Sequence, residues 1–343
     1  MKSKKYSTTI RDVADLAGVS VATISRYLNN KSLLTEETAK KVQTAMAELN
    51  YTPNPIARNL STNRTNAIGV VMNEIGGDFF TPLLEGIIET TEKNDFNLLI
   101  FTSTGRNRYN PAMLGSMYTD GLIVFIDSLG DEDIAYLHNS DHPIVLVHKS
   151  PPTGLQIPVV TIENKRASTR LVNHLIEKHN RRNIVFLRGP EGNEDSFWRE
   201  LGYREALSTH SIPFDPRLVL VGGFDRFKAK EVIEKLVQEK TQFDAVFAGD
   251  DEAAIGVLQA LKENGISVPG KVAVVGFDDQ RLCPFLNPPL STIHAPTDLV
   301  GVNAAEQLIK MIRNEPVEDI ILLPTKLVIR ESCGCNSVPE NIE

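Results

Sequence analysis

Residues 20–29, SVATISRYLN, carry side chains that are suited to contacting DNA. The spacing predicts a short helix over 21–28 that begins at Ser20, because a serine oxygen readily accepts a hydrogen bond from the free amides of a first turn. The outward face carries small and polar groups, namely Val21, Ala22, Thr23, Ser25, Arg26 and Asn29. Such groups bond to phosphates and base edges or touch thymine methyl groups. We expect this face to read DNA, with Arg26 contacting a guanine or a phosphate.

A preceding helix is expected to hold that face in place. Thr9 and Asp12 form a capping-box pattern, and Thr9 joins Ser20 among the candidate DNA contacts at helix starts. Gly18 supplies the left-handed backbone of a tight turn. The buried stripe of this first helix is Ile10, Val13, Ala14 and Ala17. Two such helices are typical of a helix-turn-helix, although the segment alone also fits a helical hairpin on an enzyme surface.

A third helix and a short linker follow. Thr35 can cap a helix that runs to about Leu49, which completes a three-helix unit. The prolines in NYTPNPIARNL interrupt helical structure, and Asn54 followed by Pro55 is typical of a new helix start. The piece 55–60 is too short to be a stable helix in isolation. We therefore expect it to become helical only when it binds a partner.

The order and spacing of TIRDVADLAGVSVATISRYLNN, ELNYTPNPIARNL and AIGVVM resemble the lactose/galactose-repressor (LacI/GalR) family of bacterial transcription regulators. The resemblance implies a DNA-binding headpiece over 1–52 and a hinge over 53–66 that folds on operator DNA. In that family a hinge leucine wedges into the minor groove and kinks the duplex. The matching residue is Leu60, with Ala57 beside it. A linker leucine packed on the core is the alternative interpretation of Leu60.

Charge is distributed unevenly along the 343 residues, whose formal net charge is −8. Residues 1–64 hold ten Lys and Arg against five Asp and Glu, a net +5, which leaves −13 for the remainder. A basic segment on an acidic body suits a protein that docks on DNA by one end. No apolar run resembles a signal peptide or a membrane span. We expect a cytoplasmic protein with no membrane partner.

From residue 67 onward, apolar strand-like runs alternate with helical stretches, which predicts an α/β body of two doubly wound parallel sheets. Expected strands cover 68–72, 98–101, 122–126, 144–147, 159–162, 184–187, 219–221, 245–248 and 272–275. Expected helices cover 80–93, 112–118, 132–138, 166–179, 197–210, 228–239 and 252–263. A ligand is expected between the carboxyl ends of the two sets of strands.

Segments such as GDFFTPLLEGI, GNEDSFWRELGYREAL and KVAVVGFDD extend the family resemblance into this body. It implies a periplasmic-binding-protein-like effector and dimerisation domain over 67–332, followed by a tail, 333–343. The implied subdomain 1 covers about 67–161 and 293–323. Subdomain 2 covers about 162–291 and 324–332. Three crossings between the halves are expected near residues 160, 291 and 324.

The resemblance also assigns a ligand site to six residues: Phe79, Phe80, Arg199, Phe224, Asp250 and Asp278. Carboxylates and a guanidinium fix hydroxyl groups, while aromatic rings cover the apolar side of a sugar. Each residue has a structural alternative: a surface salt bridge for Arg199, helix caps for the two aspartates, and core packing for the phenylalanines. Arg106 or Arg108 could add a cation to the cleft.

We identify no nucleotide-binding, metalloprotease or hydrolase motif, so we expect no enzymatic activity, no catalytic residue and no cofactor. Cys333 and Cys335 supply at most half a zinc site, and no histidine-rich segment comes after them, so we expect no metal and reduced thiols without a role. The expected function is a repressor that binds a pseudo-palindromic operator as a homodimer and responds to a small, sugar-like effector. The alternative is a cytoplasmic sugar-binding protein or sugar-processing enzyme with an incidental helix-turn-helix.

Overall fold

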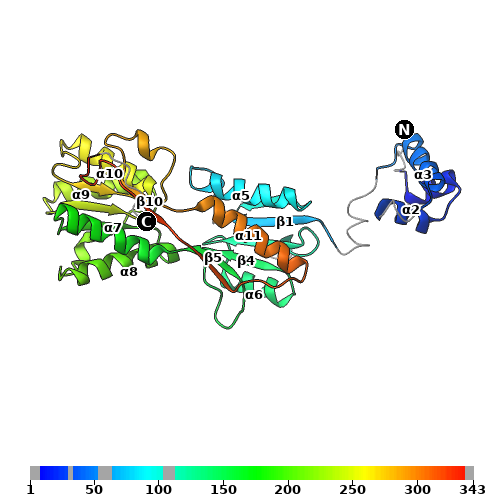
Figure 1. Cartoon of the computed structure of the whole chain (residues 1–343), viewed down its shortest axis with the longest axis horizontal. Coiled ribbons are helices and arrows are strands. Elements are labelled where there is room, and N and C mark those ends of the chain that lie inside the picture. Colours follow the sequence, from blue (N-terminus) through cyan, green and yellow to red (C-terminus); the bar gives the residue numbers. More distant parts are fainter. Residues whose placement is uncertain (1–7, 30–33, 53–63, 103–112, 337–343) are drawn as a thin grey trace, which may run out of the picture. The chain divides into compact units, whose positions relative to one another are not determined.

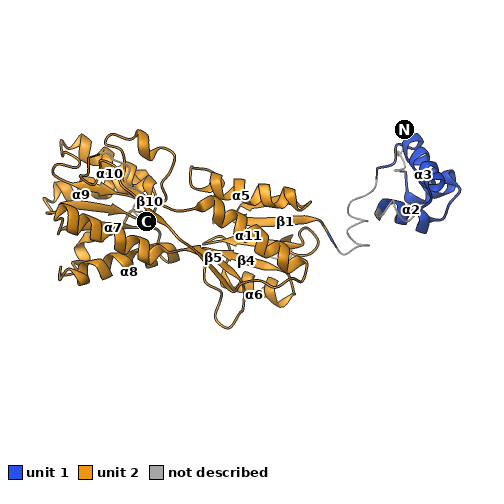
Figure 2. Ribbon diagram, viewed as in Figure 1, with its two compact units in different colours: residues 1–64 blue, residues 65–343 orange. Residues whose placement is uncertain are grey.

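The computed structural model describes residues 8–29, 34–52, 64–102 and 113–336. The chain divides into two compact units, residues 1–64 and 65–343, shown in different colours in Figure 2. The division lies within the segment that was predicted as the hinge. Ala57 and Leu60, the two candidate hinge residues, lie outside the described residues, as do Arg106 and Arg108.

Unit 1 contains the three predicted helices, α1 (Ile10–Ala17), α2 (Val21–Asn29) and α3 (Glu36–Glu48). The capping box is present at the start of α1, and Gly18 ends that helix with φ 65°, the left-handed conformation that glycine adopts without strain. Apolar side chains from the three helices form one small core, made of Val13, Ala14, Ile24, Tyr27, Val42 and Ala45. This core fixes which face of α2 points outward.

Unit 2 contains two parallel sheets (Figure 1). The six-stranded sheet has the order β11-β5-β4-β3-β1-β2. Its strands are β1 (Ala67–Met72), β2 (Asn97–Thr102), β3 (Gly121–Phe125), β4 (Ile144–Val147), β5 (Val159–Ile162) and β11 (Ile320–Leu323). Helices α5 (Phe80–Lys93) and α11 (Thr297–Ile312) pack on one face, and α6 (Asp131–Asn139) packs on the other.

The four-stranded sheet has the order β7-β6-β8-β9. Its strands are β6 (Ile184–Arg188), β7 (Val219–Val221), β8 (Ala245–Ala248) and β9 (Ala273–Val275). The helices α7 (Asn164–His179) and α8 (Glu194–Thr209) cover one face, and α9 (Arg226–Gln238) and α10 (Asp251–Glu263) cover the other. Alternate residues of β6 and β8 enter separate apolar clusters above and below the sheet, as expected for strands buried on both faces.

The chain passes between the two sheets three times. It leaves the first sheet after β5, returns after β9 through β10 (Thr292–His294), and leaves again after β11 through β12 (Lys326–Val328). Strands β10 and β12 pair antiparallel to form a two-stranded connection. These crossings place the carboxyl ends of both parallel sheets opposite each other.

Two local expectations differ from the structure. The helix expected over 112–118 is not an α-helix in its described part: residue 112 lies outside the described residues, Met113 belongs to a 3-10 helix, and residues 114–118 form turns and a bend. Gly115 and Ser116 lower the helix propensity of this stretch, and its apolar Leu114 is buried by the turn instead. Helix α11 was not predicted. It packs closely on α5 at two glycines. A Cβ atom at Gly86 of α5 would clash with the backbone of Asp298, and one at Gly301 of α11 would clash with the backbone of Leu83.

Candidate functional site

The outward face of α2 is the candidate DNA-contacting surface. Val21, Ala22 and Arg26 are exposed, while Thr23 and Ser25 are half-buried. Ile24 and Tyr27 are 0% and 5% exposed and anchor the helix to the core. The predicted face is therefore presented to solvent by the packing of its opposite side. The side chain of Asn29 lies outside what the structure describes.

Ser20 and Thr9 both act as helix caps. The Ser20 hydroxyl oxygen accepts a hydrogen bond from the amide of Thr23 at 3.1 Å, and the Thr9 oxygen accepts one from Asp12 at 3.4 Å. Both residues are exposed. Because helix N-termini favour anionic groups, a phosphate contact there is compatible with the capping role.

All six predicted ligand residues line one cavity of about 450 Å³ between the two sheets. The cavity is formed by loops that follow the carboxyl ends of β1, β3, β6, β7, β8 and β9, where ligands bind in open α/β sheets. Three of its non-glycine residues, Asp127, Phe224 and Asp278, have positive φ angles of 60°, 56° and 108°. Such strained backbone is common at binding sites. The structure thus brings the six predicted residues together in one cavity.

Aromatic rings form the wall on the side of the six-stranded sheet. Phe79 and Phe80 contact each other edge to face with centroids 5.2 Å apart, and both contact Phe125 at 6.0 and 5.4 Å. Phe224 lies on the opposite side, with its ring centroid 5.6 Å from the guanidinium carbon of Arg199. Phe79, Phe80 and Phe224 are all half-buried, so they are neither simple core residues nor free surface rings. Phe125 was not predicted as a site residue.

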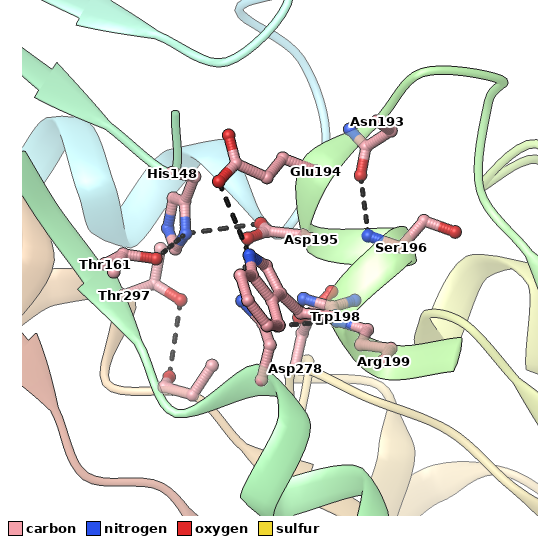
Figure 3. Close-up of polar contacts among 12 residues, drawn as sticks. His148, Thr161, Asn193, Glu194, Asp195, Ser196, Trp198, Arg199, Asp278 and Thr297 are labelled. Carbon is pink, nitrogen blue, oxygen red and sulfur yellow. Dashed lines mark hydrogen bonds and ion pairs between the residues drawn. The ribbon is translucent and has the colours of Figure 1, made fainter. Parts of the chain in front are cut away.

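Arg199 is 3% exposed and is held from several directions. Its Nε donates to Asn164 at 2.8 Å, its Nη1 donates to the carbonyl of Gly249 at 2.6 Å, and its Nη2 lies 3.5 Å from an oxygen of Asp278. The guanidinium also stacks 3.7 Å above the ring of Phe277. The surface salt bridge considered for Arg199 is therefore wrong. The arginine is a buried, oriented donor (Figure 3).

The two predicted aspartates have different local roles. Asp250 caps α10, because its Oδ1 accepts a hydrogen bond from the amide of Ala253 at 2.9 Å. Asp278 caps no helix and faces Arg199 instead. Burial raises the pKa of Asp250 to about 7, against the lowering effect of the Ala253 amide. Burial likewise raises the pKa of Asp278 well above its usual value, although Arg199 opposes the shift.

The raised pKa of Asp250 predicts a pH-dependent loss of stability. A carboxyl whose pKa rises from 3.8 to about 7 on folding binds a proton more tightly in the folded state. Its stabilising contribution is therefore complete below about pH 3.8 and disappears as the pH rises through about 7. Asparagine retains the cap without the charge. We expect Asp250→Asn to be increasingly more stable than wild type from pH 4 to 7, by at most about 4 kcal/mol.

Urea unfolding of both proteins across this pH range measures the difference. Asp225→Asn is the matched control, because Asp225 caps α9 in the same way but is exposed. A constant stability difference between Asp250→Asn and wild type over the whole range contradicts the assignment.

The start of α8 connects the two halves of unit 2 through three consecutive residues. Asn193 donates to Asp127 at 2.9 Å, Glu194 accepts from the amide of Ser150 at 2.7 Å, and Asp195 pairs with His148 at 3.2 Å. Asp127 follows β3, and Ser150 and His148 follow β4, so each contact crosses from one sheet to the other. Figure 3 shows the His148–Asp195 pair beside Arg199 and Asp278.

Asp195 is the buried centre of this connection. It also accepts a hydrogen bond from Asn164 at 2.7 Å, and the same Asn164 accepts one from Arg199. Burial alone would raise the pKa of Asp195, but the facing His148 lowers it below the usual value. Sequence reasoning missed these residues. The sequence feature that could have indicated them is the run Asn193-Glu194-Asp195 after β6, but such a run is also an ordinary helix start.

Acidic groups dominate the cavity lining. Eight carboxyl side chains line it, and Arg199 and Arg226 are its cations among the described residues. The carboxyls are Glu74, Asp78, Asp127, Asp195, Asp225, Asp250, Glu252 and Asp278. Arg226 is paired with Glu252 at 2.8 Å. The cavity therefore offers many hydrogen-bond acceptors and disfavours anionic ligands.

A second cavity of about 610 Å³ lies on the other side of the His148–Asp195 pair. Trp198, Ile320 and Leu322 contribute to its lining together with α7 side chains. Trp198 donates to Glu194 at 3.4 Å and does not line the cleft that contains Arg199. The smaller cavity is the stronger candidate for a ligand site, because it lies at the strand ends of both sheets and contains Arg199, Asp250 and Asp278, which are buried charged groups.

A helix-turn-helix unit linked to a two-sheet body with such a cleft defines a ligand-responsive DNA-binding regulator. Residues 9–54 match the family model described as bacterial regulatory proteins, lacI family. Residues 172–333 match the model of a periplasmic binding protein-like domain. Both matches agree with the division into a helical unit and an α/β unit.

Characterised relatives match over nearly the whole chain. The transcriptional regulator RegA of Clostridium saccharobutylicum is 32% identical over 331 residues, covering 95% of this chain and 99% of the relative. Catabolite control protein A of Priestia megaterium is 30% identical with the same coverage. The repressor PurR of Vibrio parahaemolyticus is 31% identical over 329 residues, covering 94% of this chain and 98% of the relative.

Solved structures agree. The lac repressor dimer bound to operator and the anti-inducer ONPF superposes with a TM-score of 0.82 at 25% identity, covering 96% of this chain and 99% of that one. The complex of the regulator CelR with cellobiose superposes with a TM-score of 0.71 at 29% identity, covering 95% and 99%. The chain belongs to the LacI family of bacterial transcriptional regulators.

Family membership decides between the two functions considered from the sequence. The relatives are DNA-binding regulators of transcription and not enzymes, so the sugar-processing alternative is not favoured. Within the described residues, none of the helices has the length and apolar character needed to cross a membrane.

Proposed function

We propose that this regulator binds a pseudo-palindromic operator as a homodimer and that a small, neutral, polyhydroxylated ligand in the 450 Å³ cavity changes its affinity for DNA. The observation that carries the ligand class is the composition of the cavity: aromatic rings on two sides and an excess of carboxyl groups around one buried arginine. Hydroxyl groups donate to such acceptors, and the ring faces cover the apolar side of a sugar.

The relatives support this ligand class. CelR was solved with cellobiose, and a LacI-family regulator from Enterococcus faecium, 23% identical, has the same fold and contains bound ribose. The cavity volume falls in the range of sites for small molecules of this size. Sugar phosphates rank below neutral sugars, because the cavity already holds many more carboxyl groups than cations.

We propose that the working protein is divided as its sequence indicates: a headpiece over 1–52, a hinge over 53–66, and an effector and dimerisation domain over 67–332. Exposed apolar side chains on α5 and on the edge strand β2 support a dimer interface there, namely Ile88, Leu99 and Ile100. A two-fold dimer presents two α2 helices, so the half-sites are expected about one helical turn apart.

The hinge assignment gives a separate prediction. Leu60 and Ala57 lie outside the described residues, and their role rests on the family resemblance. Leu60→Ala is expected to lower the affinity for the selected operator, because an apolar wedge that kinks the duplex is lost. The substitution should leave the affinity for random DNA and the melting temperature of the protein unchanged. Fluorescence anisotropy on both DNA types measures this, and equal losses on both would contradict a wedge.

The ligand is found by thermal-shift screening of the full chain against neutral mono- and disaccharides, including ribose and cellobiose, with their phosphate esters as comparison. A ligand present at 100 times its Kd stabilises the fold by about 2.7 kcal/mol. We expect a neutral sugar to give the largest shift. A larger shift with a sugar phosphate or a free purine would contradict the proposed ligand class.

A further inference from the structure

Two histidines and two cysteines gather where the C-terminal end of α7 meets the segment after β12. His174 and His179 come from α7, and Cys333 and Cys335 come from the last described stretch of the chain. One ligand atom from each residue lies within 4.8 Å of the other three. His174 and Cys333 are buried, and the other two are half-buried. This cluster is separate from the cleft and from the DNA-contacting helix, and neither proposed role uses it.

We propose that these four residues bind one Zn²⁺ ion in tetrahedral coordination. Zinc bonds of about 2.0–2.1 Å to nitrogen and about 2.3 Å to sulfur place tetrahedral ligand atoms about 3.3 Å apart for two nitrogens and about 3.5 Å apart for nitrogen and sulfur. The two Nε2 atoms are 3.2 Å apart, and Cys335 Sγ lies 3.5 Å from His174 Nε2 and 3.3 Å from His179 Nε2. Three of the four ligand atoms are thus already spaced as zinc requires, while the Sγ of Cys333 lies within 4.8 Å of the other ligand atoms and donates to the Arg330 carbonyl at 3.4 Å.

The chemistry of the donors supports the same ion. The neutral imidazole is the form that binds metal. Two imidazoles with two thiolates in tetrahedral array are typical of zinc, and binding would release the two thiol protons.

The backbone around the cysteines fits a closed site. Gly334 has φ 113°, and a side chain there would lie 3.0 Å from Nδ1 of His179. The preceding Ser332 donates to the carbonyl of Val274 at 2.6 Å, which fixes the segment to β9. Four protein ligands leave no open position, so the ion would be structural. It would join α7, whose first residue Asn164 contacts Arg199 in the cleft, to the C-terminal segment.

The sequence alone suggested silent thiols, because no histidine-rich segment lies after Cys335. The two histidines precede it by 161 and 156 positions, so no spacing rule for short metal motifs would find them. His174 and His179 are five positions apart at the end of α7, a spacing outside the i, i+3 and i, i+4 pairs that are expected to meet on a helix, so the pair forms no recognisable ligand motif.

The test uses the full, untagged chain, purified under reducing conditions, incubated with ZnCl₂ and then dialysed. Mass spectrometry of the metal content should find one zinc per chain. Cys335→Ser and His179→Gln remove half-buried ligands and should lose that zinc while circular dichroism remains unchanged. Cys283→Ala and His138→Gln are matched controls outside the cluster and should retain it. Replacement by Co²⁺ should give the intense visible bands of a tetrahedral thiolate complex in wild type and in these controls alone.

Zinc should also raise the melting temperature of wild type and of the controls, and not that of the two ligand variants. Equal zinc in wild type and the ligand variants would mean an adventitious ion only and would overturn the proposal. The same holds if reduced wild type retains no zinc, if it prefers another metal, or if its Co²⁺ spectrum is octahedral.

Discussion

Arg199→Ala is expected to weaken binding of the sugar selected by thermal shift by roughly 10- to 150-fold, equal to about 1.5–3 kcal/mol for a lost charged hydrogen bond. The arginine is buried, is oriented by Asn164, Gly249 and Asp278, and lines the cavity. Isothermal titration of wild type and variant with that sugar measures the loss.

Two further variants make this result specific. Arg204 lies on the same helix as Arg199, but its side chain is half-exposed and paired with Glu200. The variant Arg204→Ala should therefore bind the sugar with wild-type affinity. Asp278→Asn replaces the facing carboxyl at constant size and should also weaken binding, which keeps the test valid if Arg199→Ala fails to fold. Wild-type affinity in both Arg199→Ala and Asp278→Asn would place the ligand elsewhere, with the cavity beside Trp198 as the next candidate.

Arg26→Ala is expected to cost about 1–3 kcal/mol of operator affinity and to relax the base preference at one position of each half-site if Arg26 reads guanine. Arg26 is exposed on the outward face of α2, while Val21 and Ala22 can offer only apolar contact to thymine. Selection from random DNA with wild type defines the operator, and anisotropy with single-base variants of it measures both effects.

Lys41→Ala is the matched control, because it removes the same charge from α3, where Lys41 pairs with Glu37 at 2.8 Å. We expect it to change operator affinity little. If Arg26→Ala lowers binding to every sequence equally and reduces the salt dependence, Arg26 is a phosphate contact. Unchanged binding to the selected operator would remove Arg26 from the interface.

Local patterns predicted the helical unit and most strands, because these elements are decided by neighbours in sequence. The capping box at Thr9 and the turn at Gly18 are complete within a few residues, and the structure confirms both. The described residues 113–118 show the limit, because they form a 3-10 residue, turns and a bend that bury Leu114 in place of the expected α-helix.

The site was only partly predictable, because its connections are long-range. The family resemblance named six residues that line one cavity, but it gave no sign that Asn164 links Arg199 to Asp195, which lie 35 and 31 positions away. The His148–Asp195 pair joins the loop after β4 to the start of α8, and the histidine–cysteine cluster joins a helix to the last described segment of the chain. Such contacts depend on the arrangement of the sheets, which no local pattern contains.

The central claim is that a sugar in the cleft controls DNA binding. The most direct measurement is the operator affinity of the full chain, by anisotropy at fixed salt, with and without a saturating concentration of the selected sugar. We predict a change of about 5- to 150-fold in wild type, the usual range of allosteric coupling, and a much smaller change in Arg199→Ala at the same sugar concentration. An operator affinity that is identical with and without a sugar that binds the cleft would contradict the account.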